Sequence, residues 1–139
     1  MPQAPNLDAI KQVLGSGPPL RLAVLFGSGA RGTLRPDSDV DIGIVPDDAT
    51  LSLDAETDLQ IALEQACGRP VDLVRLDTAT TLLRGQVARD AQLLLEARPG
   101  EFGQFRVAAT VEYLDFLPLY DSAAERFRQR LLRNTRPSR

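Results

Sequence analysis

Two aspartates separated by one residue, Asp39 and Asp41, follow the pair Gly27-Ser28 after ten intervening residues. Alternate side chains of a strand project from the same face of a sheet. We therefore expect the two carboxylates to share a face, where they could hold one divalent cation between them. Carboxylates this close repel each other unless a cation neutralises them or one binds a proton. The spacing predicts either a metal site or a raised pKa.

The residues before the aspartates could hold an anionic group. Gly27 and Gly29 follow an apolar run and leave room for backbone N–H groups at the start of a short helix to approach phosphate oxygens. The Ser28 hydroxyl could add a hydrogen bond, or it could cap the helix instead. Arg31 and Arg35 could reach the same phosphates with their guanidinium groups, or they could be solvated loop residues.

A third acid would complete a catalytic arrangement. Asp72 lies near the start of the apolar segment 71–76 and is the natural candidate, with Asp77 as the alternative. Three carboxylates could bridge two magnesium ions that clamp the attacking and leaving oxygens of a displacement at phosphorus. One carboxylate could also accept the proton of an attacking hydroxyl, since the sequence contains no histidine.

The same glycines suggest another site. Gly27, Gly29 and Gly32 match the G-x-G-x-x-G pattern of dinucleotide-binding folds. That fold needs a crossover helix between two parallel strands. Only residues 27–38 separate the two expected strands, and Pro36 breaks the last of them. The interval is too short, and the sequence disfavours a dinucleotide site.

Composition excludes several classes of site. The 139 residues contain no histidine and one cysteine, Cys67, so histidine triads, histidine-ligated or cysteine-rich zinc sites and disulfide frameworks are absent. The sole lysine, Lys11, adjoins no glycine-rich loop and excludes a P-loop. The net charge of −3 argues against a general nucleic-acid binder, and we expect no direct sequence-specific nucleic-acid binding. No apolar run approaches the ~20 residues of a membrane span. We expect a cytoplasmic protein that is not bound to a membrane.

Apolar periodicity and turn residues define the expected elements. Strands are predicted over 20–26, 40–45, 71–76 and 92–96, and helices over 7–14, 52–67, 79–88 and 101 to about 132. Asn6 or Asp8 could cap the first helix, and Asp77 or Thr78 the third. Pro118 should kink or break the last helix. This order predicts an α/β (α+β) fold with a mixed sheet covered by helices, in a single domain over residues 1–139.

The carboxyl-terminal helical segment, from about residue 101, carries more apolar side chains than one face needs. Most should pack in the core, and some could form an interface. The segment ends in a run of arginines that could stabilise the helix carboxyl terminus or dock electrostatically on a partner or its RNA. These are Arg126, Arg128, Arg130, Arg133, Arg136 and Arg139.

Gly27-Ser28, ten residues, Asp39-Val40-Asp41 and then Asp72 resemble the GS-x10-DxD signature of minimal nucleotidyltransferases in the DNA polymerase β-like superfamily. The surrounding residues, and the segment 111–120, are similar to the antitoxins of HEPN/MNT toxin–antitoxin modules. The resemblance covers most of the chain and implies a four-stranded mixed sheet flanked by helices.

The resemblance also implies an activity. ATP and magnesium would bind at the Gly-Ser and Asp positions, and AMP would pass to a tyrosine of a partner HEPN ribonuclease toxin, which would silence the toxin. By motif match, Gly27, Ser28 and Arg31 would hold the nucleotide. Asp39, Asp41 and Asp72 would bind metal and act in catalysis, with Asp72 as the base.

Two other functions fit the same residues. The acceptor could be a small molecule, as in antibiotic nucleotidyltransferases, although those enzymes carry a further helical domain for which 139 residues leave little room. The chain could instead neutralise a toxin by binding alone, with its nucleotide site unused. The complete set of three aspartates argues against that reading.

Overall fold

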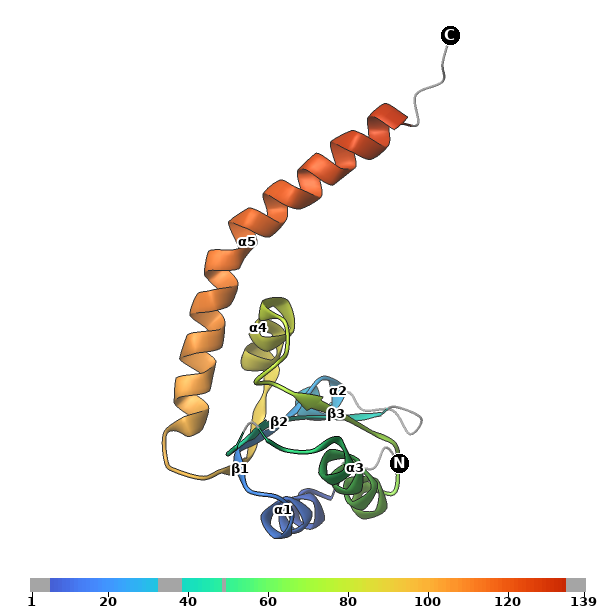
Figure 1. The fold of residues 1–139 in the computed structure, drawn as a ribbon, viewed down its shortest axis with the longest axis vertical. Coiled ribbons are helices and arrows are strands. Elements are labelled where there is room, and N and C mark those ends of the chain that lie inside the picture. Colours follow the sequence, from blue (N-terminus) through green and yellow to red (C-terminus); the bar gives the residue numbers. More distant parts are fainter. Residues whose placement is uncertain (1–5, 33–38, 49, 135–139) are drawn as a thin grey trace.

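The computed structural model describes residues 6–32, 39–48 and 50–134, and its centre is a four-stranded sheet with the strand order β3-β2-β1-β4 (Figure 1). The strands are β1 (Leu20–Phe26), β2 (Val40–Pro46), β3 (Val71–Arg75) and β4 (Gln92–Glu96). β1 runs antiparallel to β2 and β4, whereas β2 and β3 are parallel. The expected mixed sheet flanked by helices is confirmed. Each strand begins and ends within one residue of its predicted bounds.

Five helices accompany the sheet in the described residues: α1 (Leu7–Ser16), α2 (Ser28–Arg31), α3 (Leu53–Cys67), α4 (Thr81–Asp90) and α5 (Glu101–Asn134). Asn6, one of the two predicted caps, begins α1 by accepting a hydrogen bond from the Ala9 N–H at 3.2 Å. Ser52 caps α3 in the same way. No helix in the described part of the chain is long and apolar enough to span a bilayer.

The predicted start of α4 is wrong. The helix begins at Thr81 rather than Ala79, and its cap is Thr80, whose Oγ1 accepts from the Leu83 N–H at 3.2 Å. The predicted caps Asp77 and Thr78 both lie before Thr80 and outside the helix, and the Asp77 carboxylate pairs instead with Arg75 at 2.8 Å. The helix therefore starts and ends two residues later than expected.

Each face of the sheet packs against a different pair of helices. Helices α1 and α3 cover one face, and α4 and α5 lie on the other side (Figure 1). The alternating side chains of β2 divide accordingly, since Ile42 and Ile44 belong to the α1/α3 core while Val45 packs with the α4/α5 cluster. Asp41 and Gly43 alternate with Ile42 and Ile44, so the Asp41 side chain belongs to the α4/α5 face.

Helix α5 continues through Pro118 without interruption. Proline lacks the N–H for the i→i−4 hydrogen bond and its ring crowds the preceding turn, which bends a helix. Figure 1 shows α5 changing direction part-way along its length. Of the two outcomes predicted for Pro118, the structure has the kink.

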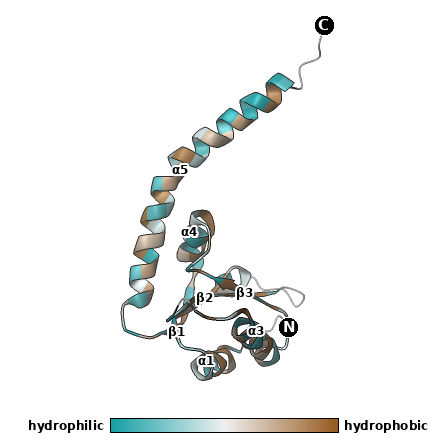
Figure 2. Ribbon diagram, in the orientation of Figure 1, coloured by the Kyte–Doolittle hydropathy of each residue, from teal (hydrophilic) through white to brown (hydrophobic). Residues whose placement is uncertain are grey.

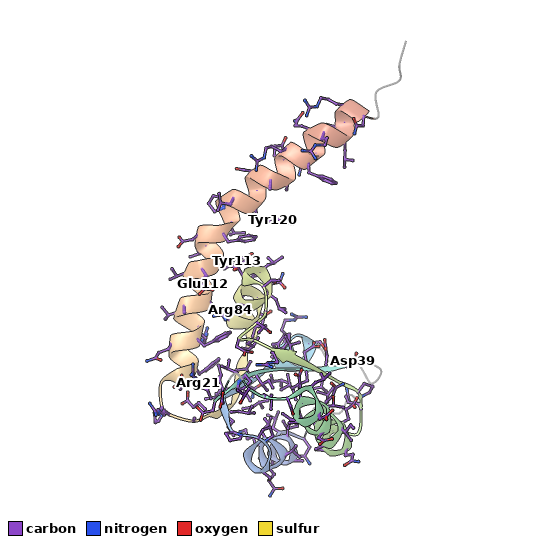
Figure 3. The ribbon with its side chains drawn as sticks, viewed as in Figure 1. Arg21, Asp39, Arg84, Glu112, Tyr113 and Tyr120 are labelled. Carbon is purple, nitrogen blue, oxygen red and sulfur yellow. The ribbon has the colours of Figure 1, made fainter. Side chains whose placement is uncertain are left out.

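The contact between α4 and α5 depends on a glycine. A Cβ on Gly85 would lie 2.5 Å from Cγ of Tyr113, so the tyrosine ring can reach α4 only because residue 85 has no side chain. Beside it, the Arg84 guanidinium lies 3.5 Å from Glu112 and 5.6 Å from the ring centre of Phe105. Figure 3 shows Arg84, Glu112 and Tyr113 together where the two helices meet.

Substituting Gly85 tests this contact. We expect Gly85→Ala to destabilise the protein by about 1–3 kcal/mol, because the added methyl overlaps Tyr113 and must displace α5. Gly103→Ala is the matched control in α5, since nothing lies within 4 Å of a Cβ there, and it should stabilise by up to about 1 kcal/mol through helix propensity. Urea denaturation measures both, and a Gly85→Ala protein as stable as Gly103→Ala would contradict the packing.

Candidate active site

Three aspartates meet where β1 ends and β2 and β3 begin. Asp41 pairs with Phe26 of β1 on one side and with Asp72 of β3 on the other. Partners in a parallel register project from the same face, so the Asp41 and Asp72 carboxylates are neighbours. Asp39 lies two residues before Asp41, just ahead of β2. The structure thus brings together the three acids predicted from the sequence.

Gly27 allows the chain to pass directly over Asp41. Its φ of +70° lies in the region that favours glycine, and a Cβ at this position would overlap the Asp41 carboxylate. The same residue caps α2 through its backbone, without a side-chain cap. Ser28 is therefore the first residue of α2, and the alternative reading of Ser28 as the helix cap is wrong.

Burial and like charge both act on Asp41. Partial burial is the largest cause that raises the pKa of its carboxyl above the ordinary value, followed by the charges of Asp72 and then Asp39. The Arg31 guanidinium opposes this by lowering the same pKa. The net direction is upward, as the spacing of the aspartates predicted.

Arg31 connects the site to α4. Its Nη1 donates to Oδ2 of Asp90 at 3.2 Å, at the carboxyl end of α4. The contact uses one of the five guanidinium donors and holds Arg31 within electrostatic reach of Asp41. Arg35, the other candidate phosphate ligand, lies outside the described residues.

The carboxylates suit a hard cation by type. Oxygen donors are what magnesium prefers, and a cation would relieve the repulsion that raises the Asp41 pKa. In the described ranges no three His, Cys, Asp or Glu side chains are yet arranged as a metal site. Asp39 and Asp72 are exposed, whereas Asp41 is half-buried.

Asp77 belongs to a different part of the molecule from Asp72. It follows β3, whereas Asp72 is near the start of that strand, and Arg75 binds it through both Nε and Nη2. In Figure 3, Asp39 and Arg21 lie at opposite ends of the sheet. Asp77 lines a pocket together with Arg21. Of the two candidates for the third acid, only Asp72 adjoins Asp41 in the described structure.

The strand directions exclude the dinucleotide alternative. β1 and β2 are antiparallel, and α2 between them has four residues, so no crossover unit exists here. Gly32 instead ends α2 in the left-handed conformation. Two glycines of the pattern, Gly27 and Gly32, therefore flank the short helix α2, and Gly29 lies within it.

Comparison with known proteins agrees with this arrangement. A family model described as polymerase beta, nucleotidyltransferase matches residues 8–99, which include the turn and all three aspartates. This chain belongs to the polymerase beta nucleotidyltransferase family. The family to which the sequence motif pointed is confirmed.

The nucleotidyltransferase is similar to proteins of toxin–antitoxin systems. It is 37% identical to the protein adenylyltransferase MntA of Shewanella oneidensis over 94 residues. These residues make up 68% of this chain and 67% of that protein. A crystal structure of a toxin–antitoxin with AMP-PNP has a chain that matches with 30% identity and a TM-score of 0.76, over 88% of this chain and 98% of that one. A chain in the structure of a tri-AMPylated Shewanella oneidensis HEPN toxin in complex with MNT antitoxin matches with 27% identity and a TM-score of 0.71, over 88% of this chain and 95% of that one.

Sequence reasoning missed one residue of this nucleotidyltransferase site. Asp90 lies 59 positions from Arg31, and an acid at the carboxyl end of a helix gives no sign that it binds an arginine after β1. An acid there is unfavourable to the helix dipole, which is the one local anomaly that could have drawn attention.

The raised pKa predicts a pH-dependent stability. Because folding raises the pKa of Asp41 above its ordinary 3.8, its stabilising contribution is complete below that pH and is lost as the pH rises through the folded value. In the nucleotidyltransferase kept in EDTA, we expect Asp41→Asn to raise the melting temperature by a few degrees at pH 7 and by nothing at pH 3. Thermal unfolding across this range measures the difference.

The control variant is Asp115→Asn, which removes a carboxylate from an exposed position on α5. Two outcomes would show that the gain in melting temperature does not come from the crowded carboxylate of Asp41. One is an Asp41→Asn gain that persists unchanged at pH 3, and the other is an equal gain from the control.

Proposed function

We propose that this chain is an antitoxin that transfers AMP from ATP to a tyrosine hydroxyl of a HEPN ribonuclease toxin and thereby silences it. The observation that carries the proposal is the meeting of Asp39, Asp41 and Asp72 beside the Gly27 turn, in a chain homologous to a protein adenylyltransferase. The relative solved with a tri-AMPylated HEPN toxin supports both the reaction and the partner.

In the proposed reaction the acceptor oxygen attacks the α-phosphorus of ATP, a new P–O bond forms, and the bond to the bridging oxygen breaks in line as pyrophosphate leaves. The hydroxyl proton passes to a carboxylate. Asp72 is the proposed base because it is exposed to an incoming acceptor and shares its face with Asp41. The chain has no histidine that could take this role.

The proposed nucleotide contacts come from the turn after β1. The backbone N–H groups at the start of α2, after Gly27, and the Ser28 hydroxyl would approach the phosphate oxygens. Within the described residues Asp90 accepts from one Arg31 guanidinium donor, and the other donors would face the phosphates. Asp90 would then serve to hold Arg31 in position.

Magnesium dependence is part of the proposal. Asp39, Asp41 and Asp72 would hold the metal, with two ions as the expected number. Bound there, magnesium would supply charge stabilisation to the oxygens at the reacting phosphorus. Burial is the largest cause of the raised pKa of Asp41, and repulsion from Asp72 and Asp39 adds to it; a cation at this position would stabilise the ionised carboxylate against both.

The first test is mass spectrometry of a candidate HEPN toxin, sought among the products of the neighbouring genes, after incubation with the chain, ATP and magnesium. We expect mass gains in whole AMP units on tyrosine, and their loss by at least about 100-fold in the Asp39→Asn, Asp41→Asn variant. EDTA should abolish them as well. No gain despite a stable complex would mean that the chain neutralises its partner by binding alone.

A second test separates the two acids that the sequence left open. Asp72→Asn should reduce AMP transfer by roughly 10²–10⁴-fold if Asp72 is the base. Asp77→Asn is the matched control, because it removes the same charge from a residue that pairs with Arg75 away from the site. Initial rates of transfer from labelled ATP compare the two. Loss of transfer in Asp77→Asn with retention in Asp72→Asn would reverse the assignment.

A further inference from the structure

Helix α5 is much longer than the surface available to support it. Its 34 residues extend about 50 Å, whereas the ten residues of α4 extend about 15 Å. Figure 1 shows the carboxyl-terminal part of α5 extending beyond α4 without another element beside it. The end of this helix must therefore be stable without contacts to the rest of the described chain, or be covered by another molecule.

The face of α5 that packs on the protein continues into the extended part. Phe105 and Ala109 are buried against the α4/α5 side of the sheet, and Tyr113 contacts Gly85. Steps of three, four or seven residues from Tyr113 continue the same face of the helix, and we call these residues the distal stripe: Phe116, Tyr120, Phe127 and Leu131.

The distal stripe exposes large apolar side chains. Tyr120, Phe127 and Leu131 are 47%, 59% and 48% exposed, and the rings of Phe116 and Tyr120 lie 5.7 Å apart. Figure 2 shows hydrophobic residues recurring among hydrophilic ones along this part of α5. A continuous apolar row that extends a packed face is typical of a protein-binding surface rather than of solvent-facing helix.

The charge around the stripe indicates the chemistry of what covers it. Residues 119–134 contain four arginines and two acids, in a chain whose net charge is −3. Arg128 is paired within the helix with Glu125 at 2.6 Å. The remaining excess is positive, which favours a partner surface that is apolar at its centre and carries carboxylates at its margin.

The position of the stripe relates it to the active site. α4, α5, Asp41 and Asp72 are all on the same face of the sheet. A protein seated on the distal stripe beyond the end of α4 would therefore extend over the face from which the aspartates project. This is the position that a protein acceptor of AMP must occupy.

We infer that the distal stripe is the docking surface for the protein substrate, the HEPN toxin, which would present an apolar helix face flanked by carboxylates. This inference rests on the proposed function. Docking on α5 supplies affinity for the acceptor while the aspartates supply the chemistry, so the two can be separated by substitution.

The test is the double variant Phe127→Asp, Leu131→Asp, compared with Leu132→Asp. Leu132 is the neighbour of Leu131 and is 55% exposed, but each residue turns about 100° around the helix axis, so Leu132 lies off the distal stripe. In titrations against the HEPN toxin that the first mass-spectrometry test identifies, we expect Kd to rise at least about 30-fold for the double variant and less than about 3-fold for Leu132→Asp. The KM for ATP should not change in either variant.

The outcomes distinguish this inference from the proposed function. Equal loss of toxin binding in both variants, or none in the double variant, overturns the docking surface. A double variant that changes the self-association of the isolated chain and leaves toxin binding intact would assign the stripe to a second copy, and also overturns it. Absence of AMP transfer by the unmodified chain would instead contradict the proposed function. Circular dichroism melting curves for each variant verify that α5 remains folded.

Discussion

The half-buried carboxylate of Asp41 is the constraint on which this structure depends. It is crowded by two other aspartates and lies under the turn after β1, and each of these neighbours limits what the chain can do. The residue that crosses over it must be glycine, both for its positive φ and because a side chain would overlap the carboxylate. Strands β1, β2 and β3 must end or begin at the same edge to bring these groups together.

This crowding costs stability, and the rest of the fold compensates. Ionised carboxylates in a partly buried position are unfavourable in the folded state, which is a common property of sites built for charged ligands. The α1/α3 side of the sheet provides a continuous apolar core that includes Ile42 and Ile44, the two side chains that alternate with Asp41 and Val45 on β2. One face of β2 therefore stabilises the sheet while the other presents the acids.

The α4/α5 side has a second role. Its apolar cluster is small, and α5 extends well past it. The close contact of Tyr113 with Gly85 fixes the direction in which α5 leaves the domain, and the kink at Pro118 changes that direction again. The two features place an exposed apolar row at a distance from the sheet but on the same side as the aspartates. A protein substrate needs such a separation because it must be held by a surface far larger than the reacting hydroxyl.

The sequence by itself determined the strands, most helices and the pairing of Asp39 with Asp41, because apolar periodicity, caps and the spacing of these two acids are local properties. It did not determine the choice between Asp72 and Asp77, the cap at Thr80, the partner of Arg31 or the reason for Gly85. Each of these depends on which strand lies beside which, or on a residue tens of positions away. Only the parallel pairing of β2 with β3 placed Asp72 next to Asp41, since register is set by packing of whole strands rather than by neighbours in sequence.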